Sequence, residues 1–484
     1  MTPATENIVT VDHFINGEIT KASNYRYHND PGKLSAVVAS VANGTADDAE
    51  QAIQAAHNAY LSWRNVEPRA RVEMMMKAGD ILDECAKELA PLLVREHGGM
   101  LWEAQADFAL GKGVLQHTAS LAETFLEPVN IDDDQCTIRI EKRPRGVVAA
   151  IVPWNMPVVL TMMKLAPALA TGNTLVLKPS PFASAALTIA LQRIAVAFPR
   201  GVINVVHGDL EVGERLTSHP LVRKIGFTGG TATARAVMKS AAKSIKNFTL
   251  ELGGNDPAIV LDDADIGKTL DRMLPGIFTR SGQICFAVKR IYVPRAMHDQ
   301  FVDSLCDRVS KFVVGHGLSD GVNFGPLATE AQYHNVRKLI DTARASDAQV
   351  VELGRLADGI DKHDGYYVLP HIVIGASHTD QVSCCEQFGP IIPIIAYDDE
   401  EQVVEWANDT EYGLGSSIWT SSGERGMLLA SRIEAGSTFI NSHSFESLDL
   451  RMPFGGIKLS GIGREFGEAG MGEYIEEHAI RLLK

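Results

Sequence analysis

Residues 146–180 read GVVAAIVPWNMPVVLTMMKLAPALATGNTLVLKPS, and this stretch decides the fold. Its apolar start predicts a buried strand, a helix is expected over 160–171, and NTLVLK predicts a second strand. The alternation continues with helices expected over 183–198, near 210–218 and near 231–243, and with strands at VINVV and KIGF. Because short apolar strands that alternate with helices form parallel sheets covered on both faces, the sequence predicts an α/β fold.

Polar motifs follow the predicted strands where the strands end: PWN (153–155), KPS (178–180), HGD (207–209) and FTGG (227–230). Parallel α/β sheets bind ligands at the carboxyl ends of their strands, so these motifs mark a binding edge. A second alternating region starts near 257, with strands at PAIVLDD, RIYVP, IIPIIAYDD and STFIN and helices over 296–313 and 330–347. The segment LELGG (250–254) lies between the two regions, where active sites often form.

The rest of the chain bounds the class of protein. Helical spacing predicts helices over 46–63 and 69–97, and the segment 130–147 alternates polar and apolar residues like an exposed strand or arm. A length of 484 residues predicts two or more domains, and a net charge of −15 argues against binding to nucleic acid or to an anionic membrane. The start MTPATENIVTVDHFINGEIT lacks a signal-peptide pattern, and no segment is apolar enough to span a membrane. A soluble, cytoplasmic protein is therefore expected.

Six scattered cysteines show no metal-ligand spacing, so no metal site is expected. A lone cysteine is most often a small buried hydrophobe, but Cys285 follows Gly282, which permits a turn that exposes the sulfur of a nucleophile. Glu251, at the boundary between the two regions, is either a general base or an ordinary ion-pair partner. Asn155 either donates to a developing oxyanion or forms a turn.

Two further features suit a bound nucleotide. Lys178 ends an apolar strand and either binds ribose or phosphate or is a solvated lysine. The glycine turn at 229–230 precedes a predicted helix, whose N-terminal amides favour phosphate, although a plain tight turn has the same pattern. The usual GxGxxG dinucleotide fingerprint is absent.

In their order and spacing, PWN, KPS, FTGG, ELGG, GQIC, EQFGP and PFGGIKLSGIGRE resemble the motifs of the aldehyde dehydrogenase superfamily, from FINGE (14–18) nearly to the C-terminus. The resemblance implies a Rossmann-type cofactor domain, a second α/β catalytic domain and a β oligomerisation arm. The implied boundaries are 1–129 and 148–251 for the NAD(P)-binding domain, 252–440 for the catalytic domain, and 130–147 and 441–484 for the arm and the C-terminal segment. The arm and a strand near 476–483 imply a homodimer or homotetramer.

The resemblance also implies a division of labour in oxidising an aldehyde to a carboxylic acid. Cys285 matches the nucleophile that forms a thiohemiacetal, which becomes a thioester after hydride transfer. Asn155 and the backbone N–H of Cys285 match the oxyanion hole, and Glu251 matches the base that activates the cysteine or the hydrolytic water.

NAD or NADP is the implied cofactor, with NAD favoured. The matching residues, which line the dinucleotide groove, are Pro153, Trp154, Lys178, Ser180, Gly208, Phe227, Thr228, Gly229, Gly230, Leu252, Gly253, Glu386 and Phe388. Three positions depart from the family's pattern. Pro181 replaces a glutamate that repels a 2′-phosphate, which leaves NADP use open; Ala234 replaces a helix-start glycine; and Arg280 replaces a common Asn, either to adjust local electrostatics or to engage the interdomain linker.

A small-molecule aldehyde is the implied substrate, medium-chain aliphatic or aromatic. Met156, Val159 and Met163 share a helix face that lines the family's substrate tunnel, although the same face suits ordinary core packing. Phe286 follows the nucleophile, and the loop 442–452 supplies His443 and Phe445 as candidates for the tunnel rim.

Two other functions fit the same scaffold. A CoA-acylating semialdehyde dehydrogenase usually lacks the general-base glutamate, so Glu251 favours hydrolysis. A catalytically silent binding or structural protein would have lost the cysteine, glutamate or asparagine, and all three are present.

Overall fold

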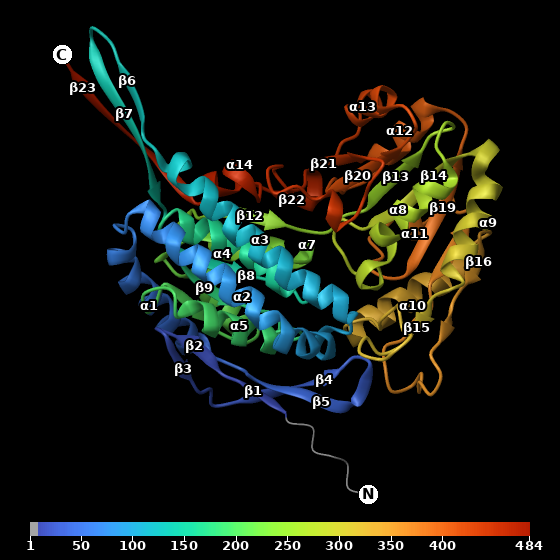
Figure 1. Cartoon of the computed structure of the whole chain (residues 1–484), viewed down its shortest axis with the longest axis horizontal. Coiled ribbons are helices and arrows are strands. Elements are labelled where there is room, and N and C mark those ends of the chain that lie inside the picture. The colour runs from blue at the N-terminus through green and yellow to red at the C-terminus, as the bar shows by residue number, and fades with distance from the viewer. Residues whose placement is uncertain (1–7) are drawn as a thin grey trace, which may run out of the picture.

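The computed structural model describes residues 8–484 (Figure 1). The first seven residues of the predicted cofactor domain, and of the start examined for a signal peptide, lie outside the described residues. Within residues 8–484, none of the helices has the length and apolar character needed to cross a bilayer.

The first large sheet has eight strands in the order β22-β12-β11-β8-β9-β10-β2-β3. Its five central strands are parallel: β8 (Val147–Ile151), β9 (Thr174–Lys178), β10 (Ile203–Val205), β11 (Val222–Thr228) and β12 (Asn247–Glu251). Antiparallel strands extend its two edges: β2 (His13–Ile15), β3 (Glu18–Thr20) and β22 (Gly461–Ile462). From β8 the chain first adds strands on one side and then, with β11, on the other, so the strand order reverses between β8 and β11. Ligands bind in the crevice at such a switch point.

Helices cover both faces of this sheet. Alternate residues of β8 explain this, because Val148 and Ala150 join one apolar cluster while Val147 and Ala149 join another. One cluster includes α2 (Pro68–His97), α3 (Leu101–Leu126), α4 (Pro157–Ala170) and α5 (Ala185–Ala195). The other includes α1 (Ala46–Trp63), α6 (Leu210–Ser218) and α7 (Thr231–Ala241).

The second large sheet has seven strands in the order β16-β18-β19-β14-β13-β20-β21. These strands are β13 (Asp256–Val260), β14 (Val288–Pro294), β16 (Gln349–Glu352), β18 (His371–Ile374), β19 (Ile391–Tyr397), β20 (Gly415–Trp419) and β21 (Ser437–Ile440). All pair in parallel except β16. The helices of this region are α8 (Ile266–Phe278), α9 (His298–Val309), α10 (Glu330–Arg344), α11 (Gln381–Cys384), α12 (Glu400–Asn408) and α13 (Gly423–Ala430).

Three smaller sheets complete the fold. One contains β1 (Val9–Val11), β5 (Lys33–Ala42) and β4 (Tyr25–Asp30), and β15 (Val313–Val314) pairs with β17 (Arg355–Leu356). The third contains β6 (Val129–Asp132), β7 (Cys136–Pro144) and β23 (Ile475–Leu483), and it projects from the body beyond the short helix α14 (Gly467–Gly472) (Figure 1).

The predicted fold class is confirmed, with corrections to individual elements. The segment 130–147 is a hairpin rather than one strand, because the chain turns between β6 and β7. The helix expected over 160–171 begins earlier, since Pro157 suits the first helical turn. The predicted domain boundary stays a prediction; β12 ends at Glu251 in the first sheet and β13 begins at Asp256 in the second.

Helix α3 was not expected from the sequence. Its glycines, Gly111 and Gly113, weaken the helical pattern, and its acidic residues Glu103 and Asp107 look like surface residues. Both acids are buried. They are explained by partners on other elements, which sequence periodicity does not reveal.

Candidate active site between the two sheets

Cys285 lies between a short 3-10 turn (Thr279–Gly282) and strand β14. The three residues Arg280, Ser281 and Gly282 have left-handed backbones, with φ of 57°, 57° and 76°. The first two are not glycines, so this conformation stores strain of about 1–3 kcal/mol each and requires firm support. Gly282 supplies the turn that the sequence predicted before the cysteine.

The Cys285 side chain is half-buried, and its surroundings keep the thiol protonated. Burial, together with repulsion from the carboxylates of Glu251, Glu386 and Asp256, raises its pKa to about 12. Lys289 lowers this pKa, and its Nζ donates to the carbonyl oxygens of Ile284 and Cys285 at 2.9 Å each. A base or a bound cationic group is needed to form the nucleophilic thiolate.

Asn155 follows β8 through Pro153 and Trp154 and reaches the nucleophile's segment. Its Nδ2 donates to the carbonyl oxygen of Gln283 at 3.0 Å, and its side chain is buried. An amide nitrogen carries two hydrogens, so this bond leaves one donor for a substrate oxygen.

Glu251 ends β12 with both carboxyl oxygens buried and without a hydrogen-bond partner among the described residues. Burial, and then repulsion from Glu465, raise its pKa well above the usual value, while Lys164 and Arg464 lower it. The nearby Lys164 Nζ and Glu465 Oε1 form a fully buried ion pair at 2.7 Å. A Cβ at Gly455 would lie 2.8 Å from Glu251 Oε1, so glycine gives this carboxyl group its space.

The switch point between β8 and β11 holds the features expected for a dinucleotide. Helix α7 starts after Gly230, and nothing lies within 4 Å of a Cβ built there, so a phosphate can approach the helix N-terminus. Lys178 ends β9, and burial lowers its pKa. The remaining residues predicted for the groove lie along the same strand ends: Pro153, Ser180, Gly208, Phe227, Thr228 and Gly229.

The other end of the predicted groove approaches Cys285. Glu386 Oε1 accepts a hydrogen bond from the backbone of Gly254 at 3.0 Å and packs against Gly253. The rings of Trp154 and Phe388 meet edge to face, with centroids 5.7 Å apart. Leu252 is buried in the segment that joins the two sheets. These residues fit a nicotinamide ring and its ribose near the thiol.

The predicted tunnel residues form an apolar cluster beside the thiol. Met156, Val159 and Met163 are almost fully buried in one cluster with Phe286. The Phe286 ring packs edge-on against Phe445, with centroids 5.4 Å apart. Their role as a tunnel stays a prediction.

His443 is not a rim residue, contrary to the prediction. Its side chain is fully buried, and its Nε2 lies 2.7 Å from the Phe286 carbonyl oxygen and 3.5 Å from Asp256 Oδ2. The histidine braces the backbone behind the nucleophile, whereas Phe445 is half-buried.

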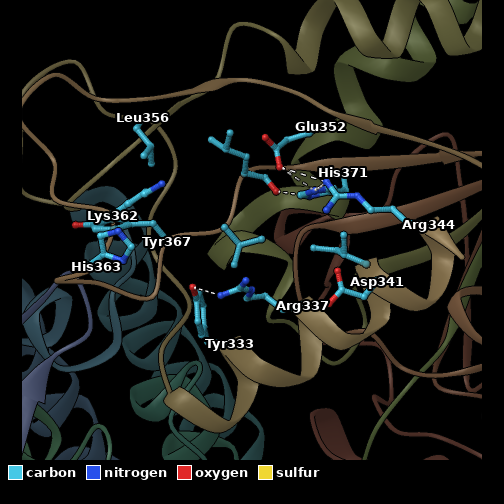
Figure 2. Close-up of a pocket in the computed structure, with 13 residues that line it drawn as sticks. Tyr333, Arg337, Asp341, Arg344, Glu352, Leu356, Lys362, His363, Tyr367 and His371 are labelled. Atoms are coloured by element: carbon cyan, nitrogen blue, oxygen red, sulfur yellow. Dashed lines mark hydrogen bonds and ion pairs between the residues drawn. The ribbon is translucent and has the colours of Figure 1, made fainter.

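A surface pocket of about 580 Å³ has Phe445 in its lining. Trp102, Arg272 and Thr279 also line it, and Thr279 begins the turn that leads to Cys285. This pocket is the candidate entrance for a substrate. The pocket of Figure 2 is different: it lies over α10, holds none of the predicted catalytic residues, and its Arg344 and His371 are turned toward Glu352.

Four residues that support the site could not be identified from the sequence: Lys164, Gln283, Lys289 and Gln332. Gln332 Nε2 donates to the carbonyl oxygens of Gln387 and Phe388, at 2.9 and 2.8 Å. Only Lys289 carried a signal, because a lysine in the apolar stretch CFAVKR needs a buried acceptor.

The chain is similar to known proteins over almost its whole length. The model of the aldehyde dehydrogenase family matches residues 21–480. The chain is 34% identical to geranial dehydrogenase of Castellaniella defragrans, over 98% of this chain and 100% of that protein. It is 38% identical to the NADP-dependent succinate-semialdehyde dehydrogenase of Escherichia coli, over 89% of each. The solved structure of betaine aldehyde dehydrogenase from Staphylococcus aureus in complex with NAD+ superposes with a TM-score of 0.93 at 32% identity, over 98% of this chain and 95% of that chain.

Proposed function

Because this chain belongs to the aldehyde dehydrogenase family, we propose that it oxidises an aldehyde to a carboxylic acid through a thioester on Cys285. The protein is an NAD(P)-dependent oxidoreductase. The observation that carries the proposed mechanism is the unpartnered, buried Glu251 carboxyl beside a protonated thiol, with Asn155 joined to the thiol's own segment.

In the proposed reaction Cys285 is the nucleophile, Asn155 stabilises the oxyanion, and Glu251 acts as a base in two steps. Glu251 removes the proton of Cys285, and the thiolate attacks the carbonyl carbon to form a thiohemiacetal. The free N–H of Asn155 and the backbone N–H of Cys285 hold the resulting oxyanion. Glu386, Trp154 and Phe388 would hold a nicotinamide beside this carbon, where it would supply the hydride acceptor that turns the thiohemiacetal into the thioester. Glu251 next releases the thiol proton to solvent and deprotonates a water molecule, whose oxygen attacks the thioester carbon. The C–S bond breaks, and the departing thiolate takes the proton from Glu251, which leaves the acid and the free thiol.

The raised pKa of Glu251 suits this double role. A carboxylate of ordinary pKa is too weak a base to remove a thiol proton, whereas a buried one holds protons more strongly. Within the part of the chain that the structure describes, its oxygens have no hydrogen-bond partner, which leaves them available to a thiol or a water.

We propose a medium-chain aliphatic or aromatic aldehyde as the substrate. Phe286 shares an apolar cluster with Met156, Val159 and Met163, and the entrance pocket carries Trp102 and Phe445. An apolar chain gains about 25 cal/mol per Å² when it leaves water for such surroundings. The relative that acts on geranial fits this proposal better than the one that acts on succinate semialdehyde.

We propose that the arm of β6, β7 and β23 joins two copies of the chain. Its strands leave the apolar residues Val129, Ile131, Ile480 and Leu482 exposed, and its outer strands have unpaired edges. Substituting Ile480→Lys and Leu482→Lys together should reduce the assembled mass seen by light scattering; an unchanged mass would contradict this role.

We also propose a cytoplasmic location. All six cysteines lie within the described residues and are free thiols, which fits a reducing compartment. Fractionation of cells that make the protein tests this.

The proposed function is tested by NAD(P)H absorbance over a panel of aldehydes of increasing chain length. Cys285→Ala should bind cofactor without turnover, and retained turnover would refute the nucleophile. Adding coenzyme A separates the alternative chemistry, because acyl-CoA formation in place of free acid would refute hydrolysis by Glu251.

A further inference from the structure

We propose that Arg280 is a positioning residue that holds Asn155 in register with Cys285. This inference rests on the proposed oxyanion role of Asn155. The sequence left two roles for Arg280, local electrostatics or contact with a linker. The contacts of its guanidinium favour a third role, directed at the catalytic amide.

The Arg280 side chain is one of the largest fully buried side chains in the protein. Its Nε donates to the Asn155 carbonyl oxygen at 3.0 Å, and its Nη2 donates to the His97 carbonyl oxygen at 3.0 Å. Its Nη1 lies 3.8 Å from Glu103 Oε2. A planar guanidinium directs several N–H groups in fixed directions, so these contacts also fix its orientation.

The backbone and the side chain of Asn155 are both held by the segment 280–283. Its carbonyl oxygen accepts from the Arg280 side chain, and its own amide donates to the Gln283 carbonyl oxygen. Gln283 is tied back in turn, because its backbone N–H and its Nε2 both donate to the Arg280 carbonyl oxygen. Cys285 follows two residues later, so the nucleophile and the oxyanion donor share one support.

The other side of Arg280 is fixed by helix α3. Glu103 Oε1 accepts the Arg280 backbone N–H at 2.6 Å, which supports the left-handed backbone at this residue. One turn further, Asp107 accepts the N–H groups of Val158 and Val159, at 3.1 and 2.7 Å, and so holds the start of the helix that follows Asn155. The chain makes room for the guanidinium with Gly99, where a Cβ would overlap Nη1.

The Arg280 guanidinium reaches the carbonyl oxygens of Asn155 and His97 and the carboxylate of Glu103, so we expect its effect on the reaction to pass through Asn155. A double-mutant cycle tests this dependence. Arg280→Lys keeps the charge but loses the planar fork, and Asn155→Ala removes the oxyanion donor. We expect Arg280→Lys to lower kcat about 10- to 100-fold, within the roughly 100- to 1,000-fold loss typical of a missing oxyanion donor. In the Asn155→Ala background the same substitution should lower kcat by less than about threefold.

The matched control is Arg71→Lys. Arg71 is also buried, and its Nε donates to the carbonyl oxygen of Ala170 at the opposite end of α4, at 3.0 Å. This control should leave kcat within about threefold of the parent. Binding of NADH, followed by fluorescence, should be unchanged in both lysine variants.

Gly99→Ala serves as a second route if Arg280→Lys does not fold, since the added methyl group displaces the guanidinium without removing it. Equal losses of kcat with and without Asn155, for either substitution, would overturn the positioning role. An Asn155→Ala variant with normal kcat would instead refute the proposed oxyanion hole itself.

Discussion

Replacing Glu251 by glutamine should make the fold more stable while it abolishes turnover. In the folded protein this carboxyl group is buried, has no hydrogen-bond partner among residues 8–484 and has a pKa raised well above the usual 4.5. The unfolded chain ionises it in water near that ordinary value. Ionisation therefore favours the unfolded state, and the neutral amide removes this penalty.

The size and sign of the effect follow from proton linkage. Below about pH 4.5 both states hold the proton, and the glutamate costs nothing relative to glutamine. Above that pH the unfolded state loses its proton first, so stability falls by up to about 1.4 kcal/mol for each pH unit until the folded group also ionises. The advantage of Glu251→Gln should thus grow from about pH 5 towards neutral pH, by no more than about 1.4 kcal/mol for each pH unit.

Thermal unfolding of both proteins at several pH values between about 5 and 8 measures this difference. The control is Glu465→Gln, at a neighbouring buried glutamate that is paired with Lys164 at 2.7 Å. Removing one member of a buried ion pair costs about 3–5 kcal/mol, so this variant should be less stable. A Glu251→Gln protein that is less stable than its parent near pH 8, or a pH-independent gain, would refute the reasoning.

The same Glu251→Gln protein should release NAD(P)H in a slower burst, because in the proposed mechanism Glu251 also forms the thiolate of Cys285. Steady turnover should fall about 100-fold or more, because the thioester lacks its hydrolytic base. Normal steady turnover would remove Glu251 from the mechanism.

Three further predictions concern the thiol, the cofactor and the substrate. Alkylation of Cys285 by iodoacetamide in the free enzyme should be slow at neutral pH and rise steadily towards about pH 12, and a plateau near neutrality would contradict the burial argument. The Asp209 carboxylate pairs with Arg26 beside Pro181, where it would repel a 2′-phosphate, so Asp209→Asn should tighten NADPH binding several-fold relative to NADH in a fluorescence titration; an unchanged ratio would place the phosphate elsewhere. Met163→Trp should raise KM for long and aromatic aldehydes at least about tenfold and spare short ones, and equal effects on both would argue against an apolar tunnel.

The first sheet could be predicted from the sequence because its strands are short apolar runs that end in polar motifs. The strands β8, β9 and β11 each deliver such a motif to one edge, and their pairing brings these motifs together. The N-terminal strands β1 to β5 and helix α3 could not be predicted this way. Strands such as Glu18–Thr20 are too short to show a period, and α3 buries acids that only their distant partners explain.

The sequence predicts those residues of the candidate site that belong to recognisable motifs. It does not predict the residues that hold them in place. Lys164, Gln332 and His443 hold backbone or carboxyl groups that come from segments far away in the sequence. His443 shows the limit most clearly. A histidine in a loop suggests an exposed rim, and only the packing of that loop against Phe286 shows that the ring is buried.

Arg280 shows why a departure from a family pattern has meaning only with its surroundings. A buried cation needs an acid and carbonyl acceptors, and it needs space. The chain provides the acid with Glu103, the acceptors with His97 and Asn155, and the space with Gly99. These partners are scattered from residue 97 to residue 155 and converge only in the fold. The arginine therefore depends on this group of buried partners. A single substitution at this position should disturb the oxyanion donor rather than the surface of the protein.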